Sequence, residues 1–276
     1  MIYVINMTGL GSRIKNVVAA IRRGHVRNDI VVCEPQFQHH YLFNINQLAT
    51  RRLFVSHYYQ TWMLLNEDDP SPQLHDMDKK TVIYSPFQDT PNYYENIIDY
   101  QYHNIKPEVI DKWLSYFDRL EWSPYIMNEV YRLFDFYNLE GITGVHIRSW
   151  YDVTDKKFLE RLYDIRQYAE LIESLGVDRI FLCMDHINIL SELKAILDPN
   201  IEIITRENFL PGHRHVAEDY HVDVMIYAAI DLHLLGRCKN IIGSYQSNFT
   251  ELAWWLGRCK ANVFIPEPKV LVEIDE

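Results

Sequence analysis

Small hydroxyl residues lie between two apolar stretches near the C-terminus. Residues 239–257 read KNIIGSYQSNFTELAWWLG, which predicts a strand at 239–243, a turn, and a helix that begins near Ser247. The first N–H groups of a helix lack partners within it and carry the positive end of the helix dipole, so this place favours an anion such as a phosphate. The alternative is that Ser247 is only the N-cap of the helix, since Ser is a preferred capping residue.

A second pattern combines a histidine and an arginine. In the stretch GITGVHIR at 141–148, His146 and Arg148 alternate with Val145 and Ile147. This alternation puts both polar side chains on one face of a predicted strand, near its carboxyl end. A planar cation with five donors can stabilise the negative charge that grows on a diphosphate leaving group. The alternative use of Arg148 is a surface salt bridge.

Polar or small residues also follow two predicted strands in the first part of the chain. The strand predicted at 1–6 leads into Gly9, Gly11 and Ser12, a glycine turn that opens a helix as in the first unit of a Rossmann-like domain. The strand predicted at 29–33 is followed by Glu34. Open α/β sheets bind ligands at the carboxyl ends of their strands, so Glu34 is a candidate base on the acceptor side, or else a residue that caps a loop.

The same rule applies to a strand in the second half. Asp185 follows the apolar stretch RIFLCM at 179–184. Its carboxylate is a candidate contact to a ribose or a base, because the carboxyl end of the strand faces the ligand crevice. The alternative is that Asp185 is the N-cap of a helix predicted at 187–197.

Strand and helix patterns alternate in both halves of the chain, which indicates an α/β protein with two Rossmann-like domains. We expect an N-terminal domain at 1–138 and a C-terminal domain at 139–276. Helices are predicted at 107–120 and 124–137 from apolar residues three and four apart. Between 36 and 104 the pattern is irregular, and it predicts a single strand at 81–85.

Composition excludes several classes of protein. The 276 residues include 38 acidic and 27 basic side chains, for a formal net charge of −11 at pH 7, so the overall field repels nucleic acids. No stretch approaches the roughly 20 apolar residues of a transmembrane helix. The opening MIYVINM is short and lacks a basic flank, unlike a signal peptide. These features predict a soluble, cytoplasmic protein.

The cysteines and histidines do not show the spacing of a metal site. The four cysteines have no CxxC spacing and are interpreted as reduced core residues. Histidines and carboxylates are dense at 213–223, and imidazole with carboxylate suits zinc or manganese. However, no HExxH or comparable motif is present, so we expect no metal, and a loop over the ligand or a solvated loop instead.

These motifs together resemble a known family. The run DLxxLGxCxxIIGxxxSNFT at 231–250, the HxR of His146 and Arg148, and the early glycine turn are similar to motifs of the GDP-fucose-dependent fucosyltransferases. That superfamily includes the protein O-fucosyltransferases and the nodulation-factor and core fucosyltransferases. The resemblance covers 141–266 with specific motifs and 1–34 more weakly.

The resemblance implies a fold, a reaction and a site. The fold is GT-B, with two Rossmann-like domains that face each other across a cleft. The reaction is the inverting transfer of fucose from GDP-fucose to a glycan hydroxyl, without a metal or another cofactor. Arg148 is implied as a catalytic residue that holds the β-phosphate. The residues implied to bind the nucleotide sugar are Gly9, Gly11, Ser12, His146, Arg148, Asp185, Asp231, Ser247, Asn248, Phe249 and Thr250.

Two further roles concern carboxylates. Asp231 belongs to the nucleotide site in similar proteins, and a carboxylate matches the N1–H and N2 amino edge of guanine; the alternative is that Asp231 pairs with Arg237 or caps a turn. The acceptor hydroxyl requires a base, for which Glu34, Asp152 and Asp219 are candidates. The sequence does not choose among these three.

The chain departs from the family pattern at three positions. Ser12 stands where Asn is usual, Asn248 replaces the second Ser, and Asp152 follows Arg148 by four residues rather than three. Two alternatives therefore stay open. One is a GT-B transferase that uses another nucleotide sugar, and the other is a noncatalytic module of the same fold that binds a glycan or a nucleotide.

Overall fold

The computed structural model describes residues 2–5, 10–11, 14–15, 18, 30–36, 61–66, 82–83, 100–103, 105–120, 122–149, 164–206 and 222–267. The chain divides into two compact units. Unit 1 comprises Met1–Val130 and Val216–Ile230, and unit 2 comprises Tyr131–His215 and Asp231–Glu276. Each unit contains its own parallel sheet. The domain limits predicted from the sequence, 1–138 and 139–276, stay a prediction.

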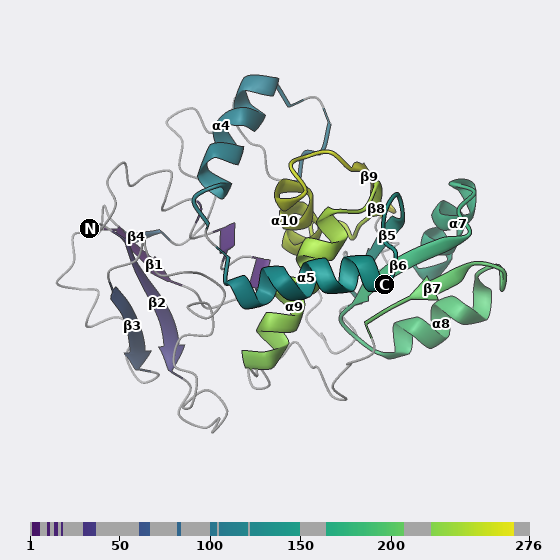
Figure 1. Cartoon of the computed structure of the whole chain (residues 1–276), viewed down its shortest axis with the longest axis horizontal. Helices are drawn as coiled ribbons and strands as arrows, with labels where there is room; N and C mark the ends of the chain where they lie inside the picture. The colour runs from purple at the N-terminus through teal and green to yellow at the C-terminus, as the bar shows by residue number, and fades with distance from the viewer. Residues whose placement is uncertain are drawn as a thin grey trace, which may run out of the picture. The chain divides into compact units, whose positions relative to one another are not determined.

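The sheet of unit 1 has four parallel strands in the order β3-β2-β1-β4. Their bounds are β1 Ile2–Ile5, β2 Ile30–Gln36, β3 Thr61–Asn66 and β4 Val82–Ile83 (Figure 1). Strand β1 lies between β2 and β4, so the strand order reverses at β1. Such a position is the usual ligand crevice of an open α/β sheet.

The structure corrects two sequence predictions in this sheet. The prediction missed β3, because TWMLLN lacks a period-two alternation of apolar and polar residues. It also ended β2 at Cys33, since Pro35 lacks an N–H to donate. However, β2 pairs with β1 only as far as Cys33, and continues to Gln36 beside β3. Glu34 therefore lies inside β2, opposite Leu64, rather than beyond the end of the strand.

Two amphipathic helices follow, as the sequence predicts. Helix α4 covers Pro107–Phe117 and α5 covers Pro124–Phe136. Both begin with Pro, whose fixed φ and missing N–H suit the first helical position. The buried faces are formed by apolar residues three and four apart, namely Trp113, Leu114 and Phe117 in α4, and Ile126, Val130 and Leu133 in α5.

The sheet of unit 2 has five parallel strands in the order β7-β6-β5-β8-β9. The strands are β5 Thr143–Ile147, β6 Arg179–Met184, β7 Glu202–Ile204, β8 Asn240–Ile242 and β9 Asn262–Phe264. The helices are α7 Ile165–Ser174, α8 Asn188–Ile196 and α10 Asn248–Leu256, and α9 Val222–Gly236 belongs to unit 2 from Asp231 onward (Figure 1). The order runs outward from β5 in both directions, which puts the topological switch point between β5 and β8.

Apolar strands and helix faces form the core of unit 2. All five residues of β5 are buried, as is typical of a parallel sheet covered on both faces. Val145 and Ile147 pack in one cluster with residues of β6, β8, α7 and α8, among them Leu182, Ile242 and Ile172. This rigid centre fixes where the backbone of β5 ends, and therefore where His146 and Arg148 lie.

Candidate functional site

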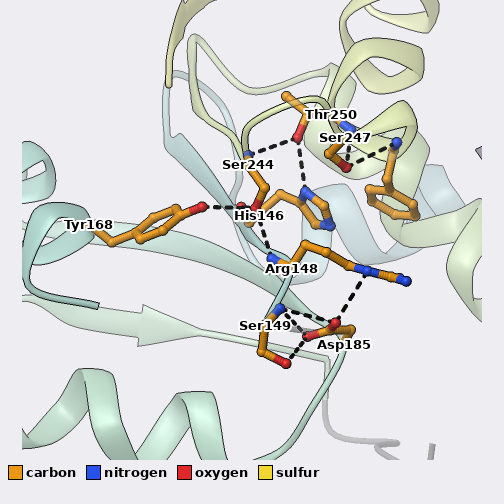
Figure 2. Close-up of polar contacts among 9 residues, drawn as sticks. His146, Arg148, Ser149, Tyr168, Asp185, Ser244, Ser247 and Thr250 are labelled. Carbon is orange, nitrogen blue, oxygen red and sulfur yellow. Dashed lines mark hydrogen bonds and ion pairs between the residues drawn. The ribbon is translucent and has the colours of Figure 1, made fainter. Parts of the chain in front are cut away.

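The ends of two neighbouring strands bring the sequence motifs together. Strands β5 and β8 pair in parallel, with Val145 opposite Ile242. The chain therefore leaves β5 at Arg148 and leaves β8 at Gly243 on the same edge of the sheet, at the switch point. Figure 2 shows that the side chains of the two motifs point toward one another there. His146, Arg148, Asp185, Ser244 and Thr250 are called the strand-end group below.

Ser244 is the centre of this group. Its hydroxyl donates to the backbone carbonyl of His146 at 3.0 Å and accepts from the backbone N–H of Arg148 at 2.8 Å. Tyr168 of α7 places its phenol 2.8 Å from the same hydroxyl oxygen. A buried hydroxyl with three partners fixes both residues around it. Ser244 therefore holds the backbone on either side of Ile147 against the end of β8.

Asp185 orients the loop that contains Arg148. Its carboxylate accepts the Ser149 N–H at 2.9 Å and the Ser149 hydroxyl at 2.8 Å. The Arg148 Nε lies 3.5 Å from Asp185 Oδ2, and the Arg148 side chain remains 19% exposed. The alternative role predicted for Asp185, the N-cap of the next helix, is wrong, because Ile187 is the N-cap of α8. Contact of Asp185 with a ribose or a base stays a prediction.

His146 is held on two sides by α10. Its Nδ1 lies 2.9 Å from the Thr250 hydroxyl oxygen, and its ring stacks on Phe249 with centroids 4.7 Å apart and planes at 25°. Burial, and to a smaller degree the Arg148 cation, lowers the pKa of His146 to about 3. The imidazole is therefore neutral at physiological pH.

Ser247 is the N-cap of α10, as the alternative interpretation predicts. Its hydroxyl accepts from the backbone N–H groups of Phe249 and Thr250. This cap begins the helix directly after the turn at 244–246, so the positive end of the helix dipole lies at the strand-end group. Contact of Ser247, Asn248, Phe249 or Thr250 with a phosphate stays a prediction.

Gly243 allows Thr250 to approach the end of β8. A Cβ atom at Gly243 would overlap the side chain of Thr250, which accepts the Ser244 N–H at 3.2 Å. A glycine is therefore required after the Ile-Ile of the motif for a steric reason. The same holds where α9 and α10 end, since a Cβ at Gly236 or Gly257 would overlap backbone atoms of the other helix.

Asp231 lies on α9 and has a different partner from the predicted one. Arg206 binds it through two parallel contacts, Nε to Oδ1 at 2.7 Å and Nη2 to Oδ2 at 2.9 Å. The alternative pairing with Arg237 is wrong, because Arg237 donates to the His233 carbonyl instead and lies over the Tyr131 ring. Among the described residues, Asp231 bonds to Arg206 and not to the strand-end group, and its predicted contact with guanine stays a prediction.

Of the remaining predicted site residues, the structure describes only two. Gly11 is buried in helical backbone, and the backbone of Glu34 lies in β2. Gly9, Ser12, Asp152 and Asp219 lie outside the described residues. The three candidate bases for the acceptor hydroxyl therefore stay predictions.

Sequence reasoning missed four residues that build the site: Ser149, Tyr168, Arg206 and Ser244. Three of them had a detectable signal. Ser149, Arg206 and Ser244 each come two residues after the end of a strand, so the rule that singled out Asp185 applies to all three. Tyr168 had none, because it occupies a core position on the apolar face of α7.

The described residues contain no group of three metal-ligating side chains and no helix long and apolar enough to cross a membrane. Most of the histidine-rich stretch at 213–223 lies outside the described residues. The expectation of a metal-independent site therefore stays a prediction.

Comparison with known proteins gives matches at the level of structure. No family model matches the sequence, and no curated protein matches it. The crystal structure of NodZ α-1,6-fucosyltransferase soaked with GDP-fucose matches 92% of this chain and 91% of its own, with a TM-score of 0.50 and 14% identity. NodZ from Bradyrhizobium matches 91% of each chain, with a TM-score of 0.48 and 15% identity.

POFUT1 in complex with GDP-fucose is also similar, with a TM-score of 0.41 and 15% identity over 83% of this chain and 59% of POFUT1. At such identities a structural match shows fold and not activity. The predicted fold class is confirmed, with two parallel α/β sheets whose strand orders reverse at a central strand. This chain has the GT-B fold of the NodZ fucosyltransferase.

Proposed function

We propose that this protein is an inverting glycosyltransferase that transfers fucose from GDP-fucose to a glycan hydroxyl. The observation that carries the proposal is the position of Arg148, which follows the central strand of the unit 2 sheet at its switch point. Its backbone is held by Ser244 and its guanidinium lies beside Asp185. The fold is that of NodZ, whose crystal was soaked with GDP-fucose, and His146 of the HxR motif contacts Phe249 and Thr250 of the SNFT motif at this edge.

The chemistry of sugar transfer fits this arrangement. When the bond between fucose and the β-phosphate breaks, negative charge grows on the departing diphosphate. A cation that is already oriented stabilises this charge without reorganising. Arg148 is partly exposed and has its backbone N–H and the neighbouring Ser149 fixed. It is therefore pre-organised for this role.

Helix α10 provides a second source of positive potential. Its N-terminus lies next to His146, to which Thr250 is bonded at 2.9 Å. The helix dipole at this end favours an anion. In this proposal, the diphosphate lies between Arg148 and the start of α10, and an acceptor-side carboxylate, Glu34, Asp152 or Asp219, removes the hydroxyl proton.

The test is calorimetric titration with GDP, UDP and ADP in EDTA. We expect selective binding of GDP to the wild type and a loss of at least about tenfold in Arg148→Ala, since hydrogen bonds to charged groups contribute about 1.5–3 kcal/mol each. Arg148→Lys should recover only part of the affinity, because an ammonium lacks the planar fork. GDP binding that is unchanged in Arg148→Ala would refute the assignment.

A matched control exists in the same sheet. Arg179 lies at the start of β6, at the opposite edge from Asp185, and pairs with Glu202 at 3.3 Å. Arg179→Ala removes the same charge without touching the strand-end group, so it should bind GDP like the wild type. Transfer to a glycan acceptor is then measured by release of GDP from GDP-fucose.

A transferase with another nucleotide sugar is the second candidate, and one observation favours it. Both oxygens of Asp231 accept from Arg206, so the carboxylate proposed to bind guanine already has two donors. Selective binding of UDP in the same titration would support this candidate. A noncatalytic module would bind a nucleotide but release no product from any donor, with or without acceptor.

A further inference from the structure

The hydrogen bonds of Thr250 determine where its hydroxyl proton goes. The backbone N–H of Ser244 can only donate, so Thr250 Oγ1 is the acceptor of that bond at 3.2 Å. The other contact of the hydroxyl is His146 Nδ1 at 2.9 Å. Thr250 is completely buried, and among the described residues Nδ1 is the acceptor available to its proton. Thr250 therefore donates to Nδ1.

We propose that Thr250 is a positioning residue that fixes His146 as the neutral tautomer with its proton on Nε2, so that His146 serves as a hydrogen-bond donor at the site. Because Nδ1 accepts from Thr250, a neutral imidazole must have its proton on Nε2. The stacked ring of Phe249 fixes the plane of the imidazole. Thr250 thus acts through His146 rather than by touching the ligand.

The surroundings of Nε2 indicate what it donates to. Figure 2 shows the second ring nitrogen on the side of the Arg148 side chain, away from Thr250. A guanidinium has five donors and no acceptor, so it offers Nε2–H no partner. Donors from His146 and Arg148 on the same side of the site fit an anionic oxygen. This step rests on the proposed function, in which that oxygen belongs to the diphosphate of the nucleotide.

A neutral donor differs from a proton carrier. Arg148, just beyond the end of β5, is the charged group that acts on His146, and the side chains of α10 that contact the imidazole are the uncharged Phe249 and Thr250. A second cation beside Arg148 would be unfavourable. Therefore His146 contributes its hydrogen bond across the neutral pH range without changing charge.

The tautomer is tested directly by nitrogen-15 NMR of the histidine ring in the nucleotide-free protein. We expect the wild type at neutral pH to show Nδ1 unprotonated and Nε2 protonated. Thr250→Ser keeps the hydroxyl and should give the same spectrum, whereas Thr250→Val removes the donor and should shift the Nδ1 resonance toward that of an averaged tautomer. A protonated Nδ1 in the wild type would overturn the proposal, whatever the protein binds.

The donor role is tested with two substitutions of His146. The amide nitrogen of Gln can reach the place of Nε2, whereas that of Asn matches Nδ1 and faces Thr250. His146→Gln should therefore keep GDP affinity within a few-fold of the wild type, and His146→Asn should lose about tenfold. Equal losses, or better binding by Asn, would overturn the donor role. If the wild type binds no nucleotide, the proposed function fails while the tautomer spectrum still stands.

Discussion

Ser244 shows how much one side chain contributes to the candidate site. Its hydroxyl has three partners, from two residues of the β5 end and from Tyr168. We expect Ser244→Ala to cost about 2–3 kcal/mol of stability, because buried partners lose their hydrogen bonds. Tyr168→Phe should cost about 1 kcal/mol, since Ser244 keeps its other partners. Urea unfolding measures both.

The double variant Ser244→Ala/Tyr168→Phe tests whether the hydrogen bonds of these two residues depend on each other. If the phenol acts through Ser244, Tyr168→Phe should cost much less in the Ser244→Ala background than alone. Additive costs would contradict this, and would mean that Tyr168 is held mainly by its second contact, the Gly243 carbonyl at 3.3 Å.

Two buried histidines predict how stability depends on pH. His146 and His233 both have a pKa lowered to about 3, mainly by burial. As the pH falls below the unfolded value of 6.5, the unfolded chain binds protons that the native protein does not. Stability is therefore complete above that pH and falls by about 1.4 kcal/mol per pH unit for each histidine. Urea unfolding between about pH 7 and pH 5 tests this slope.

His146→Gln provides the control for that slope. Because this variant removes one of the two titrating groups, the part of the pH slope of the unfolding free energy that these two histidines cause should be roughly halved. A slope equal to that of the wild type would mean that His146 is protonated in the native protein. That result would also contradict the neutral donor role.

For single residues, the sequence predicted which side chains belong to the site better than it predicted their interaction partners. His146, Arg148 and Thr250 were predicted to share a site because their motifs resemble a family, and the structure brings them together. The partner of Asp231 was not predictable, because Arg206 lies 25 residues away and an ion pair leaves no periodic pattern. Local spacing contains no information about such long-range pairs.

Gly243 connects the strand end to helix α10. A Cβ at this position would overlap Thr250, so Gly243→Ala should displace the helix start and cost about 1–3 kcal/mol by overpacking. GDP binding should be lost with it. Gly141→Ala is the matched control, because Gly141 has a φ of 72° but nothing within 4 Å of the added atom. That variant should also destabilise the fold while binding GDP normally.

Ser247 allows the cap of α10 to be separated from anion binding. Both Asp and Asn are good N-caps, so Ser247→Asp and Ser247→Asn should keep the stability of the wild type within about 0.5 kcal/mol. A carboxylate at this position would repel a diphosphate, and Ser247→Asp should therefore lose GDP binding while Ser247→Asn keeps most of it. Thermal melts and calorimetry check the two effects. Equal GDP affinity in both variants would place the anion elsewhere.

The predictability of the elements follows from their patterns. Helices α4 and α5 and strands β5 and β6 were predicted because each has a clear period or an apolar run bounded by polar residues. Strand β3 was missed although TWMLLN is also an apolar run bounded by polar residues, because a run of only four apolar residues does not distinguish a strand from part of a buried helix. The end of β2 was misplaced since pairing with β3, a long-range contact, overrides the local effect of Pro35.

For the whole molecule, the long-range field of the net charge differs in sign from the local field at the strand-end group. The chain has a formal net charge of −11, so its long-range field repels polyanions. In the proposed function, a diphosphate at the strand-end group would instead lie at contact distance from Arg148 and the start of α10. Contacts at this range are screened by salt less than the field beyond the Debye length of about 10 Å at 0.1 M.

These two effects give opposite expectations for GDP and for RNA. GDP affinity should change by no more than about tenfold over a tenfold range of KCl, since weaker attraction at the site is offset by weaker repulsion from the rest of the chain. A labelled single-stranded RNA should not bind even at the lowest salt, where a nucleic-acid-binding protein binds most tightly. Calorimetry and fluorescence anisotropy measure the two. RNA binding that falls steeply with salt would show a basic surface that the composition does not reveal, and the exclusion of nucleic acid would be wrong.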